Sequence, residues 1–178
     1  MINVMIADDH NLIREGIRQL IEFDGDMKVI AEAQDGQESL NLLTEVQPDV
    51  LLLDINMPKK SGIEVLQEMK GKKYSDVKVL ILTVHNEVEY LIKAVDIGVD
   101  GYLLKDSGSN ELKRAINSVM NGESYIQPSL IPALNSRLIS RDLDKEKLEL
   151  LTRREIEVLA NVANGMFNKD IALKLDIS

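Results

Sequence analysis

Short aliphatic runs alternate with longer stretches of helical periodicity through the first 120 residues of the chain. Apolar residues dominate the runs at 50–53 and 78–82, as expected for strands that helices cover on both faces. This alternation predicts an α/β fold with a doubly wound parallel sheet of five strands. The predicted strands are Ile2–Ala7, Val29–Ala33, Val50–Leu53, Lys78–Leu82 and Tyr102–Leu104.

A change in the pattern marks the end of this α/β region. Two prolines, Pro128 and Pro132, are followed by a charged run at residues 141–149. Proline is tolerated only in the first turn of a helix, so a helix in this stretch should begin near Pro132. The sequence therefore predicts a domain at residues 1–122 and a partly helical linker at residues 123–147.

Residues 148–178 have the pattern of two short helices. Thr152 and Glu155 have the spacing of a capping box, which begins a helix, and Asn164 with Gly165 ends it. A second helical pattern follows. Two short helices joined by a glycine-containing turn predict the first half of an all-α helix-turn-helix.

Composition and charge exclude several classes of protein. The chain has 178 residues and no cysteine, which excludes disulfides, thiolate metal sites and cysteine nucleophiles. Residues 1–128 hold 22 acidic and 13 basic side chains, whereas residues 129–178 hold eight of each, so any nucleic-acid contact must come from a local patch. No apolar run approaches the roughly 20 residues of a membrane helix, and the first residues do not form a secretory signal. We therefore expect a cytoplasmic protein without membrane contact.

Polar residues follow the predicted strands at the point where each strand ends: Asp8, Asp9, Asp54, Thr83 and Lys105. In the flavodoxin-like strand order 2-1-3-4-5, ligands bind at the carboxyl ends of strands one and three, where the order reverses. Two carboxylates about 4 Å apart repel by about 4 kcal/mol at an effective dielectric constant of 20, so three of them call for a cation. Mg²⁺, which prefers oxygen ligands and accepts a phosphate oxygen, suits this site.

The same positions suggest the chemistry. Asp54, directly after the most buried predicted strand, is the candidate nucleophile that takes up a phosphoryl group. Lys105 would balance the charge, and Thr83 would offer a hydroxyl to the phosphate. Taken singly, each has an ordinary structural alternative: a helix cap for an aspartate, a strand hydroxyl for Thr83 and a solvated charge for Lys105. Their joint placement at one edge favours the functional interpretation.

These residues lie in segments that resemble the receiver domain of two-component response regulators: Val4–His10, Leu52–Pro58, Gly62–Glu64, Leu82–Thr83 and Leu104–Lys105. Two later segments resemble the opening of a LuxR-type helix-turn-helix: Leu151–Leu159 and Asn168–Ala172. The combination resembles the NarL/FixJ type of response regulator.

The resemblance implies a site and partners. It implies phosphorylation of Asp54, Mg²⁺ bound by Asp9, Asp54 and the backbone carbonyl of Asn56 with support from Asp8, and a switch formed by Thr83, Lys105 and Tyr102. It also implies a sensor histidine kinase as phosphodonor, a homodimer upon phosphorylation, and control of transcription, with no enzymatic activity beyond self-phosphorylation and slow dephosphorylation. Of the DNA-binding module only scaffold positions are expected: Thr152, Arg153, Arg154, Asn168 and Lys169. The recognition helix is missing, so we expect promoter binding only from a full-length form.

Two alternatives remain open. The chain could act only through protein contacts, without DNA output. A magnesium-dependent phosphatase with an aspartate nucleophile is less favoured, because such an enzyme needs an acid two residues later and residue 56 is asparagine. Val84 and His85 are expected to tune the access of water to a phosphate.

Overall fold

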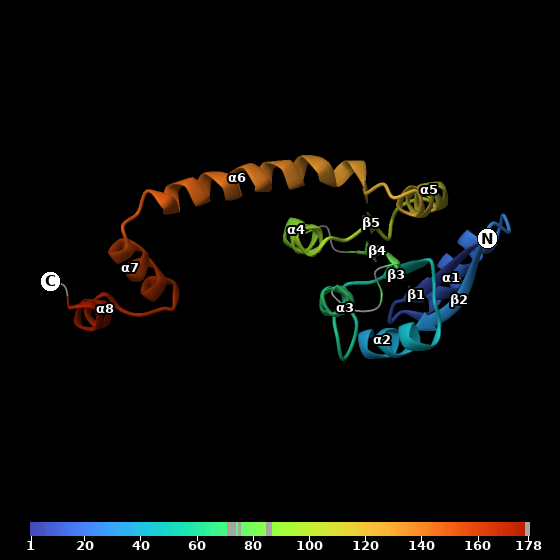
Figure 1. The fold of residues 1–178 in the computed structure, drawn as a ribbon, viewed down its shortest axis with the longest axis horizontal. Coiled ribbons are helices and arrows are strands. Elements are labelled where there is room, and N and C mark those ends of the chain that lie inside the picture. Colours follow the sequence, from blue (N-terminus) through green and yellow to red (C-terminus); the bar gives the residue numbers. More distant parts are fainter. Residues whose placement is uncertain (71–73, 75, 85–86, 177–178) are drawn as a thin grey trace. The chain divides into compact units, whose positions relative to one another are not determined.

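The computed structural model describes residues 1–70, 74, 76–84 and 87–176. The chain forms two compact units (Figure 1), Met1–Leu134 and Asn135–Ser178. They are called the first unit and the second unit below.

The first unit is built on a parallel sheet of six strands in the order β2-β1-β3-β4-β5-β6. The strands are β1 (Ile2–Ala7), β2 (Met27–Ala33), β3 (Val50–Leu53), β4 (Lys78–Thr83), β5 (Gly101–Leu104) and β6 (Tyr125–Ile126). All neighbouring strands pair in parallel. The predicted order 2-1-3-4-5 is confirmed, and the structure adds β6 beside β5.

Helices cover both faces of this sheet (Figure 1). They are α1 (Asn11–Glu22), α2 (Gly36–Glu45), α3 (Gly62–Met69), α4 (Val88–Ile97) and α5 (Ser109–Met120). α1 packs beside α5, whereas α2 contacts α3 and α3 contacts α4. The two groups therefore lie on opposite faces, as the doubly wound fold requires.

The core explains why β3 is the most apolar segment of the chain. All four of its residues are buried, because helices cover it on both sides. Alternate strand residues such as Val4, Ile6, Val50 and Leu52 join one cluster with the apolar side chains of α1 and α5. This packing holds the carboxyl ends of β1 and β3 side by side.

The start of α2 shows how closely the sequence specifies a helix cap. The side chain of Asp35 accepts a hydrogen bond from the Glu38 backbone N–H at 2.8 Å, as the predicted capping box requires. The Glu38 carboxylate, however, accepts from the backbone N–H of Gln34 and not from that of Asp35. Hydrogen bonding to Lys59 lowers the pKa of Asp35, which keeps the cap ionised.

The segment after α5 differs from the predicted linker at residues 123–147. Tyr125 and Ile126 form β6, and a short 3-10 turn, η1 (Pro128–Leu130), leads into α6 (Ile131–Glu149). Pro132 lies in the first turn of α6, where proline was expected. Leu130 and Leu134 are buried and belong to the first unit. The linker therefore begins with residues that complete the sheet.

Two further helices of the second unit are α7 (Arg153–Ala163) and α8 (Asn168–Leu175), which contact each other. Thr152 and Glu155 form the predicted capping box: each side chain accepts a hydrogen bond from the backbone N–H of the other. Gly165, with φ of 76°, lies in the turn between the helices. None of the helices among the described residues is long and apolar enough to cross a membrane.

Candidate functional site

The carboxyl ends of β1 and β3 bring the predicted aspartates together. The two strands pair up to Ala7 and Leu53, and the Asp54 backbone N–H donates to the Ala7 carbonyl at 2.9 Å. The side chains of Asp8 and Asp54 are each only 3% exposed, whereas Asp9 is more open to solvent. One ligand atom each from Asp8, Asp9, His10 and Asp54 lies within 4.8 Å of the others. We call Asp8, Asp9 and Asp54 the acidic edge.

Lys105 lies between two carboxylates of the acidic edge. Its Nζ is 2.6 Å from Asp8 Oδ2 and 2.8 Å from Asp54 Oδ2, and its side chain is 7% exposed. The backbone N–H of Lys105 donates to the Thr83 carbonyl at 2.8 Å, which ties the end of β5 to the end of β4. The structure thus places the predicted lysine in contact with the predicted nucleophile.

The environment of Asp54 raises the pKa of its carboxyl. Burial raises the pKa of this carboxyl, because a charge is poorly solvated in the interior, and the negative charge of Asp8 raises it further. Hydrogen bonding and ion pairing with Lys105 act in the opposite direction and lower the pKa without cancelling the rise. Lys105 therefore contributes most to stabilising the charged form of Asp54 against the cost of burial.

The loop after Asp54 is held in a fixed path. The Ile55 backbone N–H donates to Asp54 Oδ1 at 2.8 Å, and the Gly62 N–H donates to the Ile55 carbonyl at 2.8 Å. A Cβ atom on Gly62 would lie 2.1 Å from the Asp54 carbonyl oxygen, so only glycine fits this close approach. The exposed Asn56, whose backbone carbonyl is a predicted metal ligand, lies within this loop.

The two remaining switch candidates are interior residues of adjacent strands. Thr83 ends β4 with no exposed surface, and Tyr102 in β5 is 1% exposed. Burial, followed by the nearby charges of Glu87 and Asp54, raises the pKa of the Tyr102 hydroxyl above its usual range. Thr83 lies at the same end of the sheet as the acidic edge. Tyr102 lies in the adjacent strand, three residues before Lys105, and its ring is packed in the interior.

Two residues that the sequence reasoning did not assign to the site contact the acidic edge. Arg14, on α1, donates from Nη1 to the Asp8 carbonyl at 2.7 Å. His10 donates its backbone N–H to Asp8 Oδ1 at 2.9 Å, and its Nδ1 lies 2.7 Å from Asp9 Oδ1. The adjacency of His10 to two aspartates was a signal for this contact, whereas nothing in the spacing singled out Arg14.

Val84, which was predicted together with His85 to tune the access of water to a phosphate, is exposed. His85 lies outside the described residues, and the predicted role of both residues stays a prediction.

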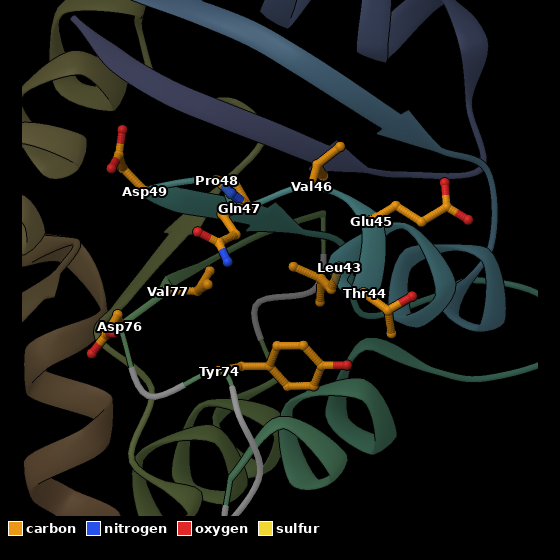
Figure 2. A pocket seen from close by; sticks show the side chains of 10 residues that line it. All are labelled: Leu43, Thr44, Glu45, Val46, Gln47, Pro48, Asp49, Tyr74, Asp76 and Val77. Atoms are coloured by element: carbon orange, nitrogen blue, oxygen red, sulfur yellow. The ribbon is translucent and has the colours of Figure 1, made fainter.

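A hollow of about 510 Å³ lies at the opposite end of the strands (Figure 2). It is lined by residues 43–49, Tyr74, Asp76 and Val77, which precede β3 and β4. Asp49 has a structural role there, because its carboxylate accepts a hydrogen bond from the Asn3 backbone N–H at 2.7 Å. None of the predicted site residues lines this hollow.

The scaffold positions of the second unit lie at the starts of its helices. Thr152 caps α7, and Arg153 and Arg154 are exposed in its first turn, where Arg154 pairs with Glu157 at 2.7 Å. Lys169 is exposed on α8, and Asn168 begins that helix. Their role toward DNA stays a prediction.

Two family models match the sequence. The response regulator receiver domain matches residues 4–117, and the luxR family of bacterial regulatory proteins matches residues 149–178. The receiver match includes every residue of the acidic edge as well as Thr83, Tyr102 and Lys105. The luxR match includes α7 and α8.

Known proteins match over nearly the whole chain. The transcriptional regulatory protein YdfI of Bacillus subtilis (strain 168) is 35% identical over 178 residues, which cover 100% of this chain and 83% of the relative. The nitrate/nitrite response regulator protein NarL of Escherichia coli (strain K12) is 35% identical over 176 residues, covering 98% and 81%.

Solved structures of response regulators share the fold. The RcsB response regulator of Salmonella typhimurium matches with a TM-score of 0.80 at 27% identity, covering 100% of this chain and 85% of that chain. Another structure contains two RcsB dimers bound to two parallel DNAs, with a TM-score of 0.73 at 28% identity, covering 99% and 84%. The chain belongs to the NarL/FixJ-type response regulators of two-component systems, transcription regulators that join a receiver domain to a LuxR-type DNA-binding domain.

Proposed function

We propose that Asp54 accepts a phosphoryl group and that its phosphorylation controls the DNA-binding output. The observation that carries this proposal is the contact between Asp54, Lys105 and Asp8 at the carboxyl ends of the strands. A buried carboxylate in contact with a cation, at the edge where doubly wound folds bind ligands, is suited to a reaction with an anionic phosphodonor.

The reaction is a transfer of one phosphoryl group. A carboxylate oxygen of Asp54 attacks the phosphorus of the donor, and the bond from phosphorus to the imidazole nitrogen of a histidine kinase, or to the acyl oxygen of acetyl phosphate, breaks. The electron pair of that bond leaves with the imidazole or the acetate. Water later attacks the phosphorus and releases inorganic phosphate, which restores the Asp54 carboxylate. The protein's own chemistry is limited to these two steps.

The acidic edge fits a Mg²⁺ ion. Carboxylate and carbonyl oxygens are the ligands that this ion prefers, and the side-chain ligand atoms lie within 4.8 Å of one another. Asp9, Asp54 and the backbone carbonyl of Asn56 would hold the ion, with Asp8 in support. Bound there, Mg²⁺ would offset the negative charge on the phosphoryl oxygens.

The phosphoryl group adds about 1.5 to 2 negative charges beside Asp8, so its contacts should differ from those of the free carboxylate. Lys105 would keep its place as counter-charge, and the Thr83 hydroxyl would donate to a phosphoryl oxygen. We expect Tyr102 to move with Thr83, because their strands are hydrogen-bonded neighbours. Moving a population from 1:99 to 99:1 takes about 5.5 kcal/mol, so these contacts must act together.

The partners follow from the two family matches. A sensor histidine kinase would supply the phosphoryl group, and the phosphorylated protein would pair as a homodimer and bind promoter DNA through a complete LuxR-type module. Dimers of RcsB bound to DNA support this arrangement. A two-fold pair of weak DNA-binding modules can read two half-sites and so gain specificity.

Intact mass spectrometry tests the proposal. The protein is incubated with acetyl phosphate and Mg²⁺, and a gain of about 80 Da, the mass of one HPO₃ group, is expected. Asp54→Asn should show no gain. Asp24→Asn, which replaces an exposed aspartate outside the acidic edge, is the matched control and should gain mass like the wild type. A gain that survives in Asp54→Asn would contradict the proposal.

A further inference from the structure

Gln127 continues the pairing of β5 and β6 with its side chain. Its backbone N–H donates to the Tyr102 carbonyl at 3.0 Å, directly after the two residues of β6. Its side-chain Oε1 then accepts the Leu104 backbone N–H at 2.8 Å and the Ser107 hydroxyl at 3.1 Å. The carboxamide oxygen therefore takes two bonds from β5 and the loop after it.

These two bonds bracket Lys105. Leu104 directly precedes it, and Ser107 follows two positions later. On the other side, the Lys105 backbone N–H is bound to the Thr83 carbonyl. The backbone around Lys105 is thus fixed by β4 on one side and by Gln127 on the other.

A lysine side chain has four rotatable bonds, so its ammonium stays in one place only if its backbone is fixed and its partners hold it. The Lys105 ammonium must meet Asp8 and Asp54 at 2.6 and 2.8 Å at once. A shift of the backbone after β5 would lengthen at least one of these contacts. We infer that Gln127 is a positioning residue for Lys105 and so for the phosphoacceptor site.

Gln127 does not touch the acidic edge itself, and it reaches that edge through Leu104, Ser107 and Lys105. It also directly precedes η1, which leads along the chain into α6. The residue therefore joins the phosphoacceptor site to the start of the segment that connects the two units. The inference rests on the proposed function for its effect on phosphorylation, but not for its effect on Lys105.

Three substitutions separate the acceptor from the bulk of the side chain. Gln127→Met keeps a similar length and removes the carboxamide acceptor. Gln127→Glu keeps an oxygen that can accept both hydrogen bonds and should restore the wild-type behaviour. Gln67→Met makes the same chemical change at an exposed position of α3 and serves as the control.

The first measurement follows the Lys105 ammonium by NMR in protein labelled with ¹⁵N-lysine, without phosphodonor. Its protons should exchange slowly with water in the wild type, because the group is 7% exposed and bound to two carboxylates. Gln127→Met removes the acceptor of both bonds and should speed this exchange at least two- to tenfold, the range that the net loss of a single hydrogen bond would give. Gln127→Glu and Gln67→Met should leave it near the wild-type rate.

The second measurement is the rate of Asp54 phosphorylation by acetyl phosphate, which should fall about two- to tenfold in Gln127→Met alone. If the ammonium exchange rate is unchanged in Gln127→Met, the inference is wrong. It is also wrong if the phosphorylation rate is unchanged in Gln127→Met while phosphorylation of the wild type depends on Asp54. If the wild type gains no mass, or gains it without Asp54, the proposed function fails. The ammonium exchange then still decides whether Gln127 positions Lys105.

Discussion

Replacement of Lys105 by methionine should reveal the electrostatic cost of the acidic edge. The Lys105 ammonium lies 2.6 and 2.8 Å from two carboxylates that are each 3% exposed. At an effective dielectric constant of 20, each contact corresponds to an attraction of about 6 kcal/mol. The ligand atoms of Asp8 and Asp54 are no more than 4.8 Å apart, so two ionised carboxylates repel by at least about 3.5 kcal/mol.

Loss of hydration offsets much of this attraction, because three charged groups leave water when the protein folds. Removal of one partner from a buried ion pair costs about 3 to 5 kcal/mol in other proteins. We therefore expect Lys105→Met to lower the free energy of unfolding by about 3 to 5 kcal/mol at neutral pH. This is a large part of the stability of a typical domain, about 5 to 15 kcal/mol.

The loss should depend on pH in one direction. Burial raises the pKa of Asp54, and removal of Lys105 should raise it further, because the lysine is the largest of the influences that lower it. A carboxyl whose pKa is raised by folding stabilises the protein below its unfolded-state pKa, and this contribution disappears as the pH rises through the folded-state pKa. The deficit of Lys105→Met should therefore be full above the pKa of Asp54 and shrink as the pH falls through it.

Urea denaturation followed by tyrosine fluorescence measures this effect. All four tyrosines, Tyr74, Tyr90, Tyr102 and Tyr125, belong to the first unit, so the signal reports on that unit alone. Lys78→Met is the control, because Lys78 forms a more exposed pair with Asp100 at 3.1 Å and should cost less than about 1 kcal/mol. A loss in Lys105→Met no larger than in this control, or one that grows toward acid pH, would refute the reasoning.

Four further predictions concern the same unit. The rate of phosphorylation by acetyl phosphate should fall as the pH drops through the raised pKa of Asp54, because only the carboxylate attacks phosphorus. A rate that stays constant until the pH reaches the usual pKa range of an exposed aspartate would contradict this. In urea denaturation, Gly62→Ala should destabilise the unit by about 1 to 3 kcal/mol, since its Cβ would overlap a backbone carbonyl. Gly16→Ala, in open space within α1, should stabilise it by about 0.5 to 1 kcal/mol. In an alkaline absorbance titration, Tyr102 should ionise only when the unit unfolds, so Tyr102→Phe should remove the last step.

The sheet was predictable wherever a strand is buried on both faces. Four consecutive aliphatic residues at 50–53, flanked by polar segments, favour a short buried strand, and β3 has the predicted bounds. β6 escaped prediction because two residues carry no periodicity and the following prolines suggested a linker. Its formation depends on the free edge of β5, which is a property of the folded sheet and not of the local sequence.

The acidic edge was predictable for a related reason. Parallel strands end at one edge, so polar residues that follow buried strands must gather there, and Asp8, Asp54 and Lys105 do so. Contacts from within helices or from distant segments were not predictable. Arg14 reaches the Asp8 carbonyl from the first turn of the amphipathic helix α1, and Gln127 reaches β5 from a stretch that was predicted to be linker. Only the three-dimensional arrangement connects them to the site.

The place of β6 has a practical consequence for chimeric regulators. A fusion that exchanges output modules at the end of α5 would strip the outer edge of β5 of Tyr125 and Ile126 and remove Gln127 from its contacts. It would also discard Leu130 and Leu134, which are buried. Recombination junctions placed after residue 134 keep these parts together, so chimeric proteins built that way should retain a receiver domain that folds and responds as it does in the parent.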